Sequence, residues 1–138
     1  MRKTFLILIM MGAIVGWMPL SQAEESRIQL SKKRLYRVEM VIEGQKLKVG
    51  ANRAELLIRD NEGKPVAGAL VRILPLIYQH GESTLMKPRV TEKGKGHYQV
   101  ENIYIEIEGH WLLKISMKIG DLEDEVVFDF PEVRRGPY

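Results

Sequence analysis

Apolar and polar residues alternate in short runs along most of the chain, and helical periodicity is hard to find after residue 23. The clearest alternation covers residues 110–119, where every second residue is apolar. The apolar set consists of Trp111, Leu113, Ile115, Met117 and Ile119. Because successive side chains of a strand point to opposite faces, this run predicts a strand that directs Trp111 into a core.

Similar short runs recur along the chain, separated by Gly, Pro, Asn and Asp. They cover residues 35–42, 47–49, 54–58, 66–73, 88–92, 98–107, 110–119 and 126–130, with a tight turn at 50–52. Such spacing is typical of a β-sandwich. We therefore expect an all-β, antiparallel β-sandwich of about seven strands.

The longest aperiodic stretch is residues 77–87, which follows the proline that is expected to end a strand, Pro75. We interpret it as an exposed loop, the type of segment that often carries function on a rigid scaffold. Its chemically distinctive residues are Tyr78, His80 and Met86. These three are the predicted partner-binding or ligand-binding residues.

The first residues have the layout of a signal peptide. Arg2 and Lys3 form a positive segment, and residues 4–20 follow without a charge. Small residues, Ser21 and Ala23, then occupy the −3 and −1 positions of a processing site. Cleavage after Ala23 would deliver the protein to the periplasm or the extracellular space. The alternative is a retained anchor and hence membrane contact, but the apolar stretch is shorter than the roughly 20 residues of a spanning helix.

The predicted organisation has four parts: a signal peptide at 1–23, a lead segment at 24–34, one β-sandwich domain at 35–131 and a loose tail at 132–138, after Pro131 ends the last strand. The chain contains no cysteine. This excludes a disulfide framework, a thiol nucleophile and a thiolate metal site, so the apolar core must hold the domain together.

The net charge of +3 is misleading, because processing would remove two of the 21 basic residues and none of the 18 acidic ones. The remaining bases and acids are interleaved, whereas a nucleic-acid-binding protein concentrates its bases in a stripe. We do not expect nucleic acid as a partner.

Several segments occur in an order that resembles the YtkA-like family, which includes the FixH-like proteins. They are residues 49–52, the D-x-x-G-x-P-V-x-G-A stretch at 60–69, residues 96–98 and residues 109–113. The resemblance spans about residues 35–130 and implies an immunoglobulin-like sandwich outside the cytoplasm. It also implies copper as the candidate cofactor, because some relatives are associated with copper handling or with assembly of copper-containing oxidases.

Relatives in this family commonly carry Met-Pro and further Met and His residues in the loop after the third main strand. This chain has Leu74 before Pro75 and retains only His80 and Met86 in that stretch. Imidazole and thioether groups are suitable ligands for Cu(I). His80 and Met86 are therefore the candidate copper ligands, whereas Met40 and Met117 fall on apolar strand faces and are expected in the core.

No motif in the chain combines a nucleophile with a positioned base, and no HExxH or paired-carboxylate arrangement is present. We therefore expect a non-enzymatic accessory or binding module that meets a protein partner in the cell envelope. Two alternatives stay open: a copper-handling module that binds Cu(I) through His80 and Met86, and a structural domain of a surface assembly.

Overall fold

Nine strands make up the part of the chain that the computed structural model describes, residues 26–82 and 86–136. No helix in these two ranges is long and apolar enough to cross a membrane. The predicted signal peptide lies outside the described residues. The strands are β1 (Ser26–Leu30), β2 (Tyr36–Ile42), β3 (Gly50–Asp60), β4 (Leu70–Ile77), β5 (Gly81–Glu82), β6 (Arg89–Gly94), β7 (His97–Ile105), β8 (Gly109–Ile119) and β9 (Leu122–Val133).

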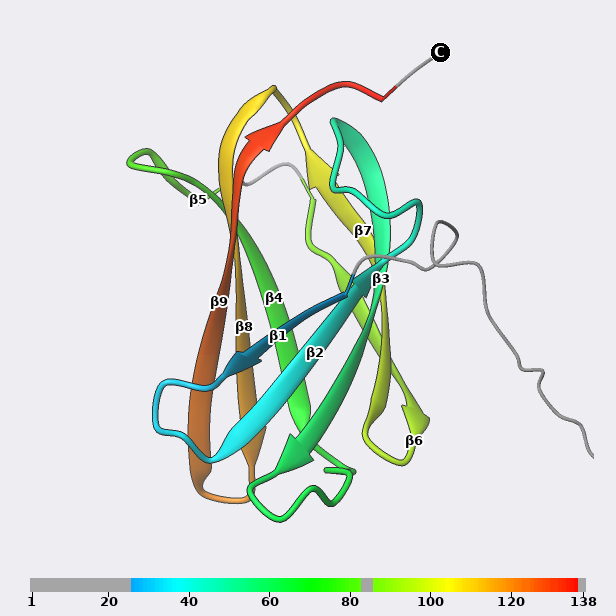
Figure 1. The fold of residues 1–138 in the computed structure, drawn as a ribbon, viewed down its shortest axis with the longest axis vertical. Helices are drawn as coiled ribbons and strands as arrows, with labels where there is room; N and C mark the ends of the chain where they lie inside the picture. The colour runs from blue at the N-terminus through cyan, green and yellow to red at the C-terminus, as the bar shows by residue number, and fades with distance from the viewer. Residues whose placement is uncertain (1–25, 83–85, 137–138) are drawn as a thin grey trace, which may run out of the picture.

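The strands form two sheets that face each other (Figure 1). One sheet has the order β1-β2-β3-β7-β6 and the other the order β5-β4-β8-β9, and every strand pair is antiparallel. The predicted all-β sandwich is therefore confirmed. The β4–β5 hairpin projects from one end of the sandwich, and the β3–β4 loop and β8–β9 turn lie at the other end (Figure 1).

The core lies between the sheets and is built from every second residue of β2, β3, β7, β8 and β9. Trp111 is fully buried, as the alternation predicts, and its indole Nε1–H donates a hydrogen bond to the Ile107 carbonyl at 2.9 Å. This bond satisfies the polar atom of a large apolar side chain. The largest fully buried side chains include Trp111, Tyr98, Phe128, Met40, Leu56, Ile58 and Met117.

Both ends of the sandwich domain extend beyond the predicted bounds of 35 and 131. Strand β1 lies within the predicted lead segment 24–34, and β9 continues through Pro131 to Val133, which is 2% exposed. The prediction of a loose tail from residue 132 is therefore wrong. A proline is tolerated here because β9 is an edge strand, where a missing N–H removes no ladder bond.

Pro75 does not end β4, contrary to the sequence prediction. The Tyr78 N–H donates to the His110 carbonyl on β8 at 2.9 Å. Since backbone groups alternate in direction along a strand, the nitrogen of Pro75 points away from β8. No ladder bond to β8 is lost there, so the strand runs on to Ile77.

The tight turn expected at 50–52 is also absent, because these residues begin β3. Asn52 is buried, and its side-chain amide bonds backbone groups of Lys48, Gly50 and Ile103. The register with β7 then shifts between Asn52 and Ala54. A bulge, and not a turn, accommodates the break in alternation.

Candidate functional site

The predicted loop 77–87 is in part a hairpin. After β4 the chain turns, the His80 N–H donates to the Ile77 carbonyl at 2.9 Å, and β5 pairs back onto β4. The turn places Gln79 at a φ of 67°, a conformation that sequence patterns associate with Asn or Gly. The sequence pattern therefore did not indicate the hairpin. Residues 83–85 of the predicted loop lie outside the described residues.

Tyr78 is the best-fixed of the predicted site residues. Its ring stacks on the imidazole of His110, with ring centroids 4.1 Å apart and an interplanar angle of 7°. The Nε2 atom of His110 in turn makes a close hydrogen bond with the carboxylate of Asp129. Three chain segments, the end of β4, β8 and β9, thus position one cluster of side chains, which we call the Tyr78–His110–Asp129 cluster.

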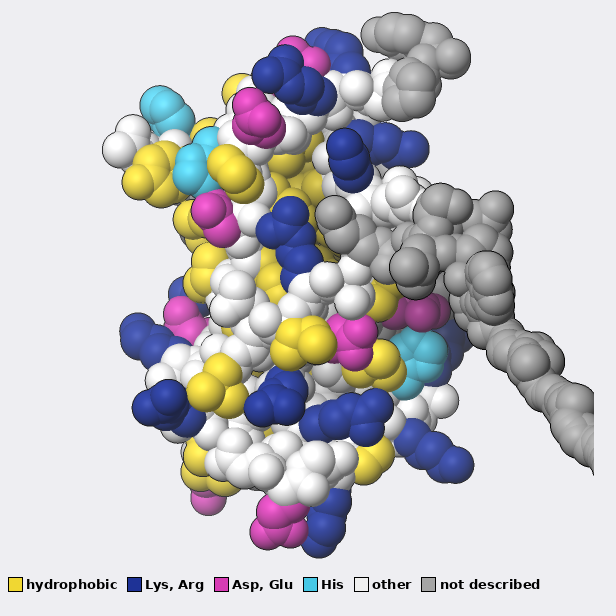
Figure 2. Space-filling model, viewed as in Figure 1, with side chains coloured by type: hydrophobic (Ala, Val, Ile, Leu, Met, Phe, Trp, Pro, Cys, Tyr) yellow, Lys and Arg dark blue, Asp and Glu magenta, His cyan; other side chains and the backbone are white. Residues whose placement is uncertain are grey.

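This cluster faces solvent. The Tyr78 residue is 44% exposed, and the side chains of His110 and Asp129 are 32% and 59% exposed. Histidine and hydrophobic side chains gather at this end of the molecule, beside the β4–β5 hairpin (Figure 2). A stacked aromatic ring held by a hydrogen-bonded histidine offers a rigid flat face with polar groups beside it, which suits contact with another molecule.

The sequence pattern indicated Tyr78, but not His110 or Asp129, as a site residue. His110 sits at a shift in the β8–β9 register, between the pairs Gly109↔Val133 and Trp111↔Phe130. Bulges re-aim side chains, and the strand pattern alone does not reveal them. The available signal in the sequence was the presence of polar residues on the solvent faces of β8 and β9.

Met86 lies elsewhere. It is 51% exposed and lines a cleft beside β4 together with residues of β4, β6 and β8. His80 is exposed on the hairpin and is not among the residues that line this cleft. Among the described residues, no group of three or more His, Cys, Asp or Glu side chains is placed to hold a metal ion.

Copper ligation by His80 and Met86 stays a prediction. The measurement is an anaerobic Cu(I) titration of the parent protein, His80→Ala and Met86→Leu. If the prediction holds, each variant loses affinity, because each substitution removes one of the two soft ligands. Equal affinity in all three proteins eliminates this pair.

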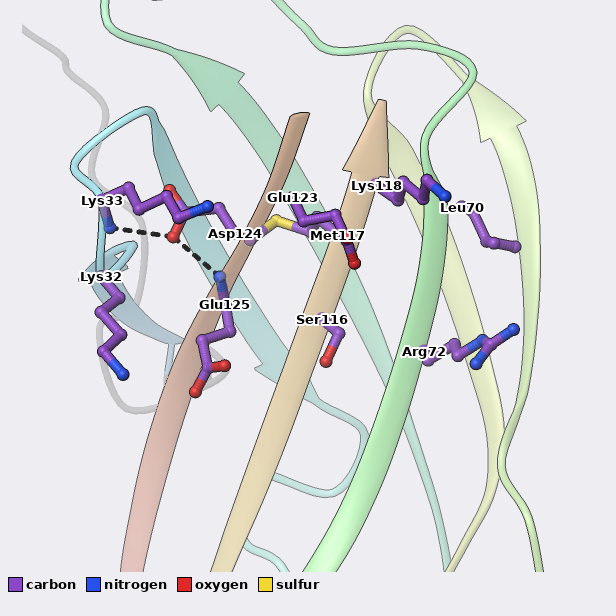
Figure 3. Close-up of a pocket in the computed structure, with 10 residues that line it drawn as sticks. All are labelled: Lys32, Lys33, Leu70, Arg72, Ser116, Met117, Lys118, Glu123, Asp124 and Glu125. Carbon is purple, nitrogen blue, oxygen red and sulfur yellow. Dashed lines mark hydrogen bonds between the residues drawn. The ribbon is translucent and has the colours of Figure 1, made fainter. Parts of the chain in front are cut away.

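Asp124 is the centre of a second cluster of hydrogen-bonded polar groups, and its role is structural. Its carboxylate accepts a hydrogen bond from the Ser31 hydroxyl at 2.6 Å. It also accepts hydrogen bonds from the backbone N–H groups of Lys33 and Glu125, at 2.9 and 2.8 Å (Figure 3). Burial acts to raise the pKa of Asp124, but these bonds and a longer one from Leu35 lower it below its usual value of 3.8. The ionised carboxylate therefore ties the β1–β2 connection to β9.

Comparison with solved structures supports the fold. The chain is similar to the crystal structure of a DUF4426 family protein from Pseudomonas aeruginosa PAO1, with a TM-score of 0.56 and 14% sequence identity. The match covers 80% of this chain and 99% of that one. At this identity the similarity concerns the fold alone. No curated protein matches the chain.

The resemblance noted in the sequence is borne out by a family comparison. The YtkA-like family model matches residues 30–116, from the end of β1 into β8. This range covers more than half of the chain and includes strands of both sheets of the sandwich. The chain therefore belongs to the YtkA-like family.

Proposed function

We propose that this protein is an exported, non-enzymatic accessory module of the cell envelope that binds a protein partner with the β4–β5 end of its sandwich. The observation that carries the proposal is the Tyr78–His110–Asp129 cluster. An exposed tyrosine is usually mobile, but stacking and a hydrogen bond hold this one in place. Pre-ordered aromatic side chains lose little conformational entropy on binding, which is why they dominate many interfaces.

The opposite sheet supports this choice of surface. Its outer face carries an ion pair between Arg53 and Glu101, at 3.3 Å, and places His97 3.3 Å from Glu55. Surface ion pairs of this kind are typical of a solvated face. The aromatic cluster therefore distinguishes the β4–β5 end from the outer face of the five-stranded sheet.

Export is the part of the proposal that rests on sequence. We expect the mature chain to begin at Glu24, because Ser21 and Ala23 fit a processing site and the preceding apolar stretch is short. N-terminal sequencing of protein from the envelope fraction measures this directly. Recovery of an intact residue 1–23 segment from the membrane would instead mean that the segment is an anchor.

Partner binding is tested by the size of the native complex. In gentle envelope extracts, the parent protein is expected to elute in a complex larger than the mature chain alone. Tyr78→Ala should release it as a smaller species, because the variant removes the exposed ring of the cluster. Tyr104→Ala is the matched control, since this partly exposed tyrosine lies on β7 of the other sheet.

Both variants are expected to unfold at nearly the parent's temperature, so a loss of the complex would report binding and not folding. Equal retention of the complex in both variants contradicts the proposed surface. Elution of the parent itself as a free chain contradicts partner binding under the conditions in which the protein is extracted.

A further inference from the structure

A cleft of about 680 Å³ lies beside β4, on the side of the four-stranded sheet away from β9. Its floor and walls are mainly apolar, and its charged lining residues are all cations. The lining consists of Val71, Arg72, Ile73, Leu74, Pro75, Met86, Lys87, Pro88, Val90, Lys114 and Ser116. No carboxylate is among these residues.

Two of the three cations have no ion-pair partner within the described residues. Lys114 lies 3.8 Å from the Glu125 carboxylate, whereas Arg72 and Lys87 form no such pair in that part of the chain. The Arg72 side chain extends from β4 away from β8 (Figure 3). Unpaired positive charge therefore borders an apolar cleft, an arrangement that favours an occupant with both acidic and apolar groups.

The same cleft runs along an open strand edge. Since the Tyr78 N–H bonds to β8, alternation directs the backbone groups of Val71 and Ile73 away from β8. Strand β5 pairs only with Leu76 and Ile77, so no described strand pairs with β4 at Val71 and Ile73 on that side. Unpaired N–H and C=O groups of an edge strand are a template for an added strand.

The opposite edge of this sheet differs. At β9, the Glu125 carbonyl accepts a hydrogen bond from the Lys32 N–H at 2.8 Å, and the Asp129 carbonyl accepts one from the Arg27 guanidinium. These two contacts cover the β9 edge with β1 and the connection that follows it. The β4 edge lacks an equivalent cover among the described residues.

We infer that the β4 edge binds an extended, acidic segment of a protein partner by strand addition. The inference rests on the proposed function and specifies the chemistry of the partner. Alternate side chains of an added strand point to opposite faces. One set of side chains would lie between the sheets near Val90 and should therefore be apolar. The other set would lie beside Arg72 on the outer face and should therefore be acidic.

The test uses the full chain, purified from cells, and fluorescence anisotropy of a labelled peptide. The peptide has about nine alternating glutamate and valine residues, a length that fills one typical strand. Two further peptides isolate the two interactions. One replaces glutamate with lysine, and the other carries N-methyl groups on every residue, which removes the N–H donors along both peptide edges.

Arg72→Glu combined with Lys87→Glu is the test variant. Arg37→Glu combined with Lys46→Glu makes the same change in net charge at exposed positions away from the cleft and is the matched control. We expect the test variant to weaken binding of the glutamate peptide by roughly tenfold or more, because attraction becomes repulsion. The control should bind within about twofold of the parent, because distant surface charges are screened by salt.

Binding of the glutamate peptide, with loss on N-methylation and on charge reversal at the cleft, supports the inference. If the parent protein does not bind the glutamate peptide, the inference is overturned. Pro75 and the cations would then serve to prevent unwanted strand pairing at the β4 edge. Equal binding of the lysine peptide overturns the acidic preference, and equal binding of the N-methylated peptide overturns strand addition.

Anionic lipid is tested in parallel with phosphatidylglycerol vesicles. Vesicle binding that disappears in the Arg72→Glu, Lys87→Glu variant, without peptide binding, would assign the cations to a membrane surface and overturn the inference. The Tyr78→Ala elution experiment is independent of these peptides, so failure of the strand-addition site and failure of the partner-binding function can be told apart.

Discussion

Trp111→Ala is expected to lower the free energy of unfolding by about 3–5 kcal/mol, the usual cost of truncating a buried large aromatic side chain. Trp111 is fully buried between the sheets, so its removal leaves a cavity that the surrounding strands can only partly fill. The variant also leaves the Ile107 carbonyl without its indole donor. Urea denaturation followed by circular dichroism measures the loss.

Trp111→Phe is the matched control, because it keeps an aromatic ring in the core and removes the hydrogen bond. It should lose clearly less stability than Trp111→Ala. An unchanged denaturation midpoint with an unchanged slope in Trp111→Ala is incompatible with the burial described above.

Asp124→Ala is expected to cost roughly 2–4 kcal/mol, because it leaves the Ser31 hydroxyl and several N–H groups without their acceptor in a buried site. Asp124→Asn keeps one acceptor oxygen and should lose less. Glu123→Ala, the exposed neighbour on the same strand, is the control and should stay close to the parent.

The effect should depend on pH with a defined sign. The pKa of Asp124 is lower in the folded protein than its usual 3.8, so the folded state favours the ionised carboxylate. Its contribution is fully present above the unfolded pKa and is lost as the pH falls through the folded pKa. The gap in stability between parent and Asp124→Asn should therefore shrink in acid, and a constant gap would show that ionisation is irrelevant.

Alternation in the sequence was sufficient to predict the sandwich and the burial of Trp111, Met40 and Met117. The alternation of apolar and polar residues along a strand is a local signal, and it arises in these strands because the opposite sheet buries one of their faces. Strand β1 was missed because its residues are mostly exposed and carry no such signal. The hairpin at β5 was missed because its turn relies on Gln79 at a positive φ.

The polar sites depended on pairings that the linear pattern does not contain. Asp124 binds groups about 90 residues away in sequence, at positions 31 and 33. The contact of His110 with Asp129 depends on a register shift at the end of β8. In both cases strand pairing determines the contact, and the sequence pattern reveals only that a polar residue is present.

The proposed partner surface is tested most directly by site-specific photocrosslinking in intact cells. A photoreactive residue at His80, which is exposed beside the Tyr78–His110–Asp129 cluster, is expected to give a discrete adduct with one envelope protein. The adduct should weaken when Tyr78→Ala is added. The same probe at exposed Asn61, in the β3–β4 loop, should give none, because this loop lies at the other end of the sandwich (Figure 1). Equal adducts from both positions, or none from His80, would contradict binding at the β4–β5 end.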